Sequence, residues 1–359
     1  MIYHLIYPLY NYFAVLNVFR YITFRTIYAT LTAALISVFI APWFIRKVSQ
    51  YELKQYIRKD GPASHQKKAG TPTMGGVFIL FSVFVSVLLW ADLGNPFVWL
   101  LLFVAITFGL IGFVDDFLVI RRQNSKGLSA RTRLICEFLL ALGVGVFLYF
   151  EPSYNTQLSV PFFKGVGPDL GVGYIFFIAL IIVGFSNAVN LTDGLDGLAI
   201  GPYLIAISTY LVLSYLAGHV KIAEYLQIPF ISNVGEATVV CGALVGASVG
   251  FLWFNAYPAQ VFMGDVGSLP LGALLGTVAI LVKHEILLVL VGGIFVLETI
   301  SVIMQVGFFK ATNGRRIFRM APVHHHFELK GWPEPKVIVR FWIIAAILSL
   351  MAISTLKLR

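Results

Sequence analysis

The sequence predicts an all-α polytopic membrane protein with about ten transmembrane helices. Three observations carry this prediction: an excess of apolar residues, repeated apolar runs of membrane-spanning length, and basic residues confined to three segments. Of the 359 residues, 58% are hydrophobic and only 12% are charged, and the mean hydropathy is +0.86. Such a composition is typical of an integral membrane protein and excludes a water-soluble domain.

Apolar runs of about 17 to 25 residues match a hydrocarbon core of roughly 30 Å, because a helix rises 1.5 Å per residue. The eighth run is short, and the ninth has a weakly defined end. No repeat of fixed period and no hydrophilic linker divides the chain, so residues 1–359 are predicted to form a single integral membrane domain. We predict transmembrane helices over residues 22–45, 74–91, 97–114, 134–150, 172–189, 199–217, 237–254, 269–283, 286–308 and 337–355.

Lysine and arginine predict the orientation. Segments 46–73, 115–133 and 309–340 hold 7, 5 and 7 of the 26 basic residues, and loops rich in positive charge stay in the cytosol. Both termini and the segments 151–171 and 218–236 are therefore expected outside. The formal charge of +9 then lies along one membrane surface, where it attracts anionic headgroups and anionic substrates. Nucleic acid is not an expected partner, because these basic residues lie in membrane-proximal loops.

Three smaller features lie outside this pattern. The first 20 residues are rich in aromatic side chains without a basic start or a cleavage site, which favours an interfacial helix over a cleaved signal. Segment 151–171 has the prolines and the polar alternation of a small hairpin. Cys136 and Cys241 fall within apolar runs, which predicts packing roles and no disulfide.

Polar side chains gather at the cytosolic ends of the predicted helices. One aspartate at such a place can simply end a helix in water, whereas five of them beside three basic segments indicate a site. Carboxylates at this density repel one another unless a cation is present, and an oxygen-rich site without thiols favours Mg²⁺ or Mn²⁺. A divalent ion surrounded by lysine and arginine suggests phosphate or diphosphate chemistry. The five aspartates are Asp115, Asp116, Asp193, Asp196 and Asp265.

The octapeptide 190–197 and the segment before Asp265 each allow two interpretations. Gly194 and Gly197 permit close backbone approach to a planar ligand, or they simply let helices pack closely. Asp193 and Asp196 are three residues apart and would share a face if the helix continued. An aromatic residue at 262 either stacks on a base or anchors the chain at the membrane interface.

The three histidines at 324–326 lack the spacing of a zinc site. In an extended segment His324 and His326 would lie on one side and His325 on the other, and the alternative is a solvated basic loop. Glu298 lies within the ninth predicted helix and is interpreted as a helix-packing hydrogen bond.

Four motifs together resemble the phospho-N-acetylmuramoyl-pentapeptide transferase family, a branch of the polyprenyl-phosphate sugar-1-phosphate transferases. The aspartate motifs are common to the whole superfamily, whereas the three histidines followed by Trp-Pro-Glu-Pro at 332–335 indicate the muramoyl-pentapeptide branch. The resemblance covers essentially the whole chain. The motifs are the pair Asp115-Asp116, Asn-Leu-Thr-Asp-Gly-Leu-Asp-Gly at 190–197, Phe-Met-Gly-Asp-Val-Gly-Ser at 262–268 and Pro-Val-His-His-His-Phe-Glu-Leu at 322–329, with Thr-Pro-Thr-Met-Gly-Gly at 71–76 as an early addition.

The resemblance implies Mg²⁺-dependent transfer of phospho-MurNAc-pentapeptide from its UDP carrier to undecaprenyl phosphate, yielding lipid I and UMP. This step of peptidoglycan synthesis would occur on the cytosolic face of the bacterial cytoplasmic membrane, with a homodimer as a further expectation. Asp265 is the implied metal ligand, Asp115 and Asp116 handle the lipid phosphate with Asp115 as base, and His324 acts near the diphosphate. The implied nucleotide and substrate pocket comprises Lys68, Thr73, Asn190, Asp193, Gly194, Leu195, Asp196, Asn255, Phe262, Gln305, Ala321, His325 and His326.

Several alternatives stay open at this point. A phosphate monoester with a second pKa near 6 is mostly dianionic at pH 7, so a general base is optional, and attack is either direct or through an aspartyl-phosphate. A related GlcNAc-1-phosphate transferase would carry the same aspartates. An intramembrane aspartyl protease would hold its aspartates within helices, and an anion transporter would show repeats and polar groups at the membrane midplane.

Overall fold

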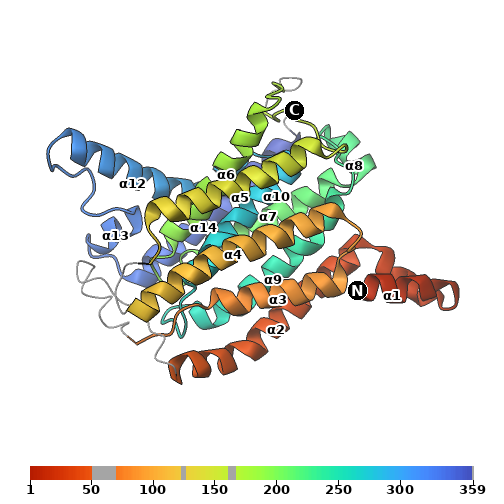
Figure 1. Ribbon diagram of the computed structural model, residues 1–359, viewed down its shortest axis with the longest axis horizontal. Helices are drawn as coiled ribbons and strands as arrows, with labels where there is room; N and C mark the ends of the chain where they lie inside the picture. Colours follow the sequence, from red (N-terminus) through yellow and green to blue (C-terminus); the bar gives the residue numbers. More distant parts are fainter. Residues whose placement is uncertain (51–69, 123–126, 161–166, 358–359) are drawn as a thin grey trace.

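The computed structural model describes residues 1–50, 70–122, 127–160 and 167–357, and the described chain folds into a bundle of helices (Figure 1). Short helical pieces precede the bundle, and a few short helices connect its longer members. In chain order the helices are α1 (Ile2–Ile6), α2 (Ile22–Gln50), α3 (Gly76–Trp90), α4 (Pro96–Arg122), α5 (Ala130–Phe150), α6 (Gly173–Thr192), α7 (Ile200–Ala217), α8 (Val220–Leu226), α9 (Ala237–Asn255), α10 (Asp265–Leu281), α11 (Leu288–Val291), α12 (Gly293–Ala311), α13 (Val323–Glu328) and α14 (Glu334–Ser354), with 3-10 turns η1 (Tyr7–Asn11), η2 (Ala14–Arg20), η4 (Val234–Glu236) and η5 (Thr355–Lys357).

Eight described helices are long and apolar enough to cross a membrane, namely α2, α4, α5, α6, α7, α9 with its preceding turn, α12 and α14. Helices α3 and α10 are apolar but shorter, with 15 and 17 residues. These ten helices correspond to the ten predicted apolar runs, so the class of an all-α polytopic membrane protein is confirmed. Ten complete crossings, and the placement of both termini outside, stay predictions.

Predicted helix boundaries beside the polar motifs are wrong by several residues, and so are the end of α2, which continues to Gln50, and the start of α5, which lies at Ala130. Helix α4 continues to Arg122, α6 continues to Thr192, and α10 already begins at Asp265. The sequence interpretation ended these helices where polar residues begin. In the structure other helices supply partners for those residues: the Asp116 carboxylate, for example, accepts the first backbone N–H groups of α10. Asp265 is therefore the first residue of a helix and not part of a loop.

The region after α10 also departs from its prediction. The run predicted over 286–308 is divided at Gly292 into the short α11 and the longer α12. The segment around the histidines is a helix, α13, and is not extended. Val323 and His324 are buried in this helix, whereas His325 and His326 stay partly exposed. Val323 packs into an apolar cluster with residues of α12 and α14, and His324 lies against Glu298.

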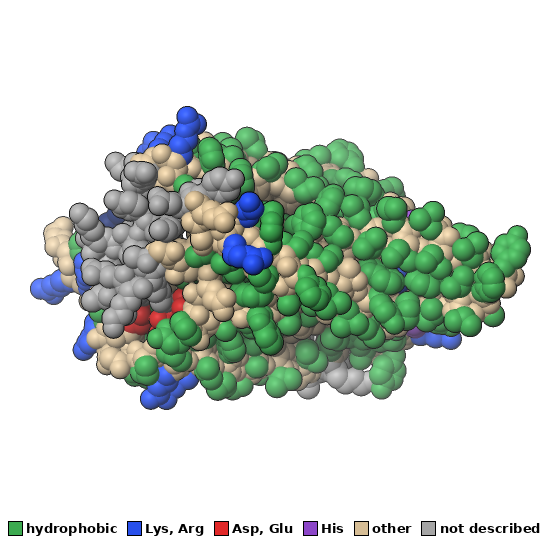
Figure 2. Space-filling view, turned by 90° about the horizontal axis from the view of Figure 1, so that it is seen from below, with side chains coloured by type: hydrophobic (Ala, Val, Ile, Leu, Met, Phe, Trp, Pro, Cys, Tyr) green, Lys and Arg blue, Asp and Glu red, His purple; other side chains and the backbone are tan. Residues whose placement is uncertain are grey.

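Consecutive helices of the bundle alternate in direction, which gathers the polar motifs at one end. At the other end Arg25, near the start of α2, forms an ion pair with Glu236 at the start of α9. Figure 1 shows α13 at the left end of the bundle and the N-terminal helices at the right end. On the face shown in Figure 2, lysine and arginine side chains concentrate at the left end around an acidic patch, whereas hydrophobic side chains cover most of the rest of that face. The basic end of the bundle is the end that the sequence predicts to face the cytosol, and that orientation stays a prediction.

Helix α10 forms the centre of the bundle. Every residue from Val266 to Leu281 is buried, and the helix packs mainly against α4 and α6, with α3 and α7 completing its surroundings. The approach to α4 is close: a Cβ atom built on Gly112 would lie 2.2 Å from the carbonyl oxygen of Asp265. Only a glycine on α4 allows this contact, so α4 and α10 form one rigid support for the aspartates that they carry.

A buried polar cluster lies at the end of the bundle away from the aspartates. The Lys283 ammonium group donates a hydrogen bond to the Tyr174 hydroxyl at 2.9 Å and lies 4.1 Å from the ring centroids of Tyr174 and Tyr154. The Tyr174 hydroxyl donates in turn to the Glu285 carboxylate. Lys283 also donates to the backbone of the predicted hairpin 151–171, which contains one isolated antiparallel bridge among its described residues. The cluster therefore fastens this segment to the bundle.

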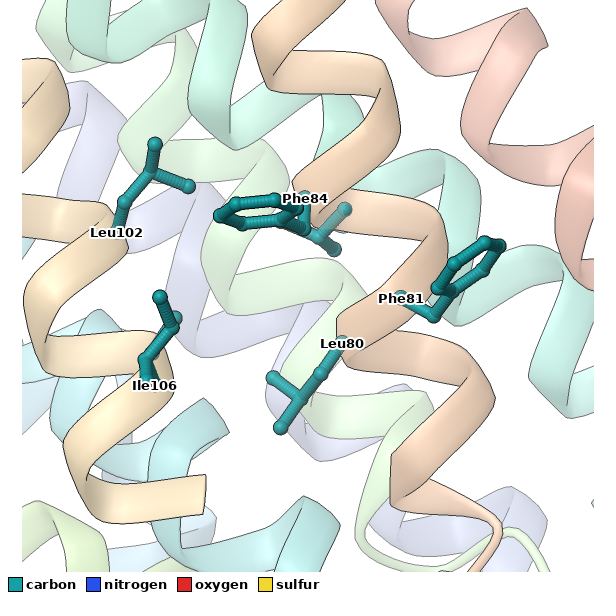
Figure 3. Close-up of a pocket in the computed structure, with 7 residues that line it drawn as sticks. Leu80, Phe81, Phe84, Leu102 and Ile106 are labelled. Carbon is teal, nitrogen blue, oxygen red and sulfur yellow. The ribbon is translucent and has the colours of Figure 1, made fainter. Parts of the chain in front are cut away.

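A crevice of about 260 Å³ lies between α3 and α4 (Figure 3). Its walls are formed by aliphatic and aromatic side chains, which include Leu80 and Phe84 from α3 and Leu102 and Ile106 from α4. With almost no polar surface, this crevice offers no group for acid–base or phosphate chemistry. The groups capable of acid–base or phosphate chemistry are the aspartates at the basic end of the bundle.

Candidate active site

Asp265 lies where α10, α5 and α6 meet. One carboxylate oxygen accepts a hydrogen bond from the Arg133 guanidinium of α5 at 2.8 Å, and the other accepts from the Asn190 amide of α6 at 2.7 Å. Asn190 also donates to the Ser268 hydroxyl at 2.9 Å, one turn further along α10. Charge-assisted hydrogen bonds of this kind are the strong ones, so three separate helices fix the position of this carboxylate.

Asp116 and Asp115 have different partners although they are neighbours. The Asp116 carboxylate accepts from the backbone N–H groups of Asp265 and Val266, at 3.2 and 3.1 Å. It thus satisfies two orphan donors of α10 and places a negative charge at the positive end of that helix. Asp115 accepts from the backbone N–H of Leu128 at 2.7 Å. Successive side chains of a helix point about 100° apart, which explains why the pair does not share a partner.

Behind Asp265 lies a polar network that the sequence interpretation missed. The Arg133 guanidinium lies 3.8 Å from the buried Glu137 carboxylate one turn along α5, and Glu137 accepts from the Asn187 amide at 2.5 Å. Arg133 was counted only as loop charge. The available signal was Glu137 itself, a carboxylate within a predicted membrane helix four residues after an arginine, which is the spacing of an ion pair on one helical face.

Asp193 follows α6 directly and begins the turn 193–197. Its side chain is partly buried, and this burial raises the pKa of the Asp193 carboxyl to about 7, helped by the negative charges of Asp265 and Asp196. The negative charges of Asp265 and Asp196 therefore act on the Asp193 carboxyl. A cation or a donor group of a ligand at this place would favour the ionised form of Asp193.

Asp196 and Asn255 hold the shape of this turn. The Asp196 carboxylate accepts from the backbone N–H of Ala259 at 3.0 Å, and its own N–H donates to the Glu334 carboxylate of α14 at 3.1 Å. The Asn255 side-chain oxygen accepts from the N–H of Gly197 at 2.9 Å, while its amide donates to a carbonyl of the following loop. Both side chains are almost fully buried. Their contacts connect the turn to α9, α14 and the loop before α10.

The segment around Phe262 pairs with the early glycine-containing motif. The backbone N–H of Phe262 donates to the carbonyl of Pro72 at 2.9 Å, and the N–H of Gly75 donates to the carbonyl of Phe262 at 2.8 Å. The Phe262 ring is partly exposed, so it can contact a ligand. Thr73 and Leu195 are buried, and they contribute packing to the floor of the site.

The three histidines have separate surroundings. His324 is fully buried, with its Nδ1 atom 3.2 Å from the Glu298 carboxylate and its Nε2 atom against Gly194. His325 Nδ1 lies 2.8 Å from the Glu328 carboxylate. His326 accepts a hydrogen bond from a backbone N–H of the preceding loop. The structure therefore places the His324 ring in direct contact with the 193–197 turn.

Gln305, Ala321 and Lys68 complete the predicted residues. The Gln305 side chain accepts from the backbone N–H groups of Ile317 and Phe318, both at 3.0 Å, and so braces the loop between α12 and α13. Ala321 is partly exposed in that loop. Lys68 lies outside the described residues.

The carboxylates suit Mg²⁺ that is bound partly by the protein and partly by the substrate. Among the described residues no three His, Cys, Asp or Glu side chains converge as a ready-made metal cage. Mg²⁺, however, usually binds through one or two carboxylates together with waters and the phosphates of a substrate. The Asp265 carboxylate in its present setting is balanced by the guanidinium of Arg133, which shows that this position holds a positive charge. The donor set therefore fits Mg²⁺ shared with a phosphate ligand.

An all-helical membrane bundle with acidic groups and basic loops at one end suits a transferase acting on phosphorylated, membrane-bound substrates. In agreement, residues 98–283 match the family model of glycosyl transferase family 4. The match covers more than half of the chain, which places the protein in that class.

Comparison with curated proteins resolves the branch of the class. Residues 68–80 match signature 1 of phospho-N-acetylmuramoyl-pentapeptide-transferase, and proteins of that name are similar to this chain over their whole length. The one from Syntrophus aciditrophicus is 62% identical and the one from Citrifermentans bemidjiense 58% identical, each over 359 residues and covering 100% of both chains. The chain belongs to the phospho-N-acetylmuramoyl-pentapeptide transferase family. The early motif at 71–76 lies within the matched signature.

Proposed function

We propose that this protein transfers phospho-MurNAc-pentapeptide from UDP-MurNAc-pentapeptide to undecaprenyl phosphate, with lipid I and UMP as products. The observation that carries the proposal is the full-length similarity to enzymes of this name, joined to a cluster of aspartates at the basic end of a membrane bundle. The reaction would take place at the cytosolic face of the bacterial cytoplasmic membrane. A homodimer stays a prediction from the resemblance.

The bond changes define what the site has to do. An oxygen of the lipid phosphate attacks the sugar-bearing phosphorus of the UDP substrate, the P–O bond to UMP breaks, and its electron pair leaves with UMP. At pH 7 a phosphate monoester is mostly dianionic, so no proton must be removed before the attack. The site therefore has to hold two anionic groups in line and stabilise the charge of the departing UMP.

The contacts of the three central carboxylates support different roles. Both oxygens of Asp116 accept backbone N–H groups, and both oxygens of Asp265 accept side-chain donors. Asp115 has one oxygen that accepts from Leu128 and a second without a hydrogen-bond partner among the described residues. We assign to Asp115 the contact with the lipid phosphate or with a proton upon it, and to Asp116 the support of Asp265.

Asp265 and a neighbouring carboxylate would hold Mg²⁺, which would supply charge neutralisation of the diphosphate when bound. Arg133, already at Asp265, would then have a phosphate oxygen as an alternative partner. The turn 193–197 and the partly exposed Phe262 ring would receive the uridine end, with Asp196 and Asn255 maintaining the shape of the turn. Whether the attack is direct or passes through an aspartyl-phosphate is left to experiment.

The test is UMP release by the purified protein in detergent. UMP should appear from UDP-MurNAc-pentapeptide only when polyprenyl phosphate and Mg²⁺ are both present, and a chelator should abolish it. Asp265→Asn should lose nearly all activity. Full activity of that variant, or indifference to the chelator, would contradict the metal assignment, and preference for UDP-GlcNAc as the donor would contradict the substrate assignment.

A further inference from the structure

Glu298 and His324 are two titratable side chains that are fully buried against each other. Glu298 lies on α12 and His324 on α13, and the side-chain exposure of the two residues is 0% and 1%. The Glu298 Oε2 atom lies 3.2 Å from His324 Nδ1. Burying either group alone would cost several kcal/mol, so each side chain makes the burial of the other tolerable.

The opposite edge of the His324 ring faces the turn of the candidate active site. A Cβ atom built on Gly194 would lie 2.4 Å from His324 Nε2 and 3.0 Å from Cε1. The ring therefore presses directly on the backbone beside Asp193, and only glycine permits this approach. Both ring nitrogens of His324 and both carboxylate oxygens of Glu298 are buried without a hydrogen-bond partner among the described residues, so the 3.2 Å approach of Oε2 to Nδ1 is an ion-pair contact and not an aligned hydrogen bond.

An interpretation as simple helix packing does not account for this arrangement. A polar contact whose only role is to join two helices would be expected to have its buried polar atoms satisfied by hydrogen bonds, and those of Glu298 and His324 have none among the described residues. Here one partner contacts the turn that carries Asp193. The carboxylate, the imidazole and the turn thus form a continuous chain of contacts from α12 to the site.

We propose that Glu298 is a positioning residue for the transfer reaction. Its negative charge, 3.2 Å from His324 Nδ1, favours a proton on that nitrogen and holds the imidazole ring beside it by an ion-pair contact, and the ring in turn holds the Asp193–Gly194 turn in the conformation that receives the nucleotide. The pair acts on the UDP substrate and not on the lipid, because Asp115 and Asp116 belong to α4 and have no contact with α12 or α13 among those described. The inference rests on the proposed function of the site.

The experiment compares Glu298→Gln with Glu285→Gln. Both variants replace a buried carboxylate by an amide of the same shape, but Glu285 lies in the cluster at the far end of the bundle. Glu298→Gln should raise the KM for UDP-MurNAc-pentapeptide at least tenfold, while the KM for polyprenyl phosphate and kcat change less than threefold. Glu285→Gln should leave both KM values unchanged, even where its Tm falls. Glu298→Asp, which keeps the charge, should recover part of the loss.

Nitrogen-15 NMR of histidine-labelled protein supplies a second measurement that needs no turnover. The His324 ring, assigned with a His324→Asn variant, should show a protonated Nδ1 in the parent chain and a changed Nδ1 shift in Glu298→Gln. An unchanged shift, or equal rises in both KM values, would overturn the proposal. If the parent protein itself fails to release UMP, the proposed function fails, while the NMR result still decides the link between Glu298 and His324. If Glu298→Gln does not fold, the same measurements on Glu298→Asp decide.

Discussion

Replacing Gly112 by alanine should remove most of the transferase activity without unfolding the protein. Gly112 faces the start of α10, where an added Cβ would lie 2.2 Å from the carbonyl oxygen and 2.3 Å from the carbonyl carbon of Asp265, and 2.5 Å from the nitrogen of Val266. These are backbone atoms, which cannot rotate away as a side chain can. The helices α4 and α10 must therefore separate at this point.

The size of the effect follows from these distances. Ordinary contact with a Cβ begins at about 3.4 Å, so the shift required is about 1 Å. Overpacking of this kind costs about 1 to 3 kcal/mol of stability. A displacement of about 1 Å at reacting groups can cost about a hundredfold in rate, or about 2.7 kcal/mol of activation free energy. Because the Asp116 contacts to α10 cross this same interface, we expect kcat/KM to fall about a hundredfold.

The measurement is UMP release at saturating Mg²⁺, with thermal unfolding recorded on the same samples. Gly184→Ala is the matched control, because Gly184 lies within α6 and a Cβ there would meet nothing within 4 Å. It should retain parental activity. Normal kcat/KM in Gly112→Ala together with a normal Tm would refute the argument that this close approach positions Asp265.

Three further predictions concern charged side chains. Arg133→Gln should lower kcat/KM at least tenfold because Asp265 loses its charged partner, whereas the exposed Arg131→Gln should stay within twofold; equal losses in the UMP assay would reject a specific role. The pKa of Asp193 is about 7 in the folded protein against a reference value of 3.8. The folded protein therefore binds this proton more tightly than the unfolded chain, and the resulting stabilisation is complete below pH 3.8 and is lost as the pH rises through about 7. In chelator, Asp193→Asn should therefore raise Tm at pH 8 and leave it unchanged near pH 4, and a gain of equal size at both pH values would contradict the shift. Lys283→Met should destabilise the protein by about 3 kcal/mol by leaving the buried Glu285 carboxylate without its charged partner 4.0 Å away, and the double variant with Glu285→Gln should recover part of this; thermal melts with no recovery would exclude the pair as the cause.

Hydropathy predicted the helices because membrane burial requires long apolar runs, and this requirement is local in the sequence. It did not predict where α4 and α6 end or where α10 begins. The ends near Asp116 and Asp265 depend on a capping contact between residues about 150 positions apart, which no local pattern contains. The same reason explains the short helix at the histidines, whose inward face exists only when α12 and α14 are in place.

The candidate site shows a similar division. The aspartates were predictable because their chemistry and their common face are visible in the sequence. The separate role of each polar residue was not predictable, because the roles of Asp196 and Asn255 depend on hydrogen bonds to Glu334, Ala259 and Gly197. In the sequence Arg133 is one basic residue of a loop segment, and Glu298 is a membrane-helix carboxylate interpreted as a packing contact. Only the structure places them against Asp265 and His324.

The burial of α10 on all sides has a consequence for how this chain tolerates change. A helix with no exposed residue between Val266 and Leu281 has no side that can accept a larger or a polar side chain. In a library of all single substitutions, α10 should therefore be the least tolerant helix, even at positions many turns from Asp265. The outward face of α12, with Ile303 and Met304 exposed, should accept most apolar replacements. Tolerance to substitution should therefore be lowest in α10 and among the highest on this face of α12.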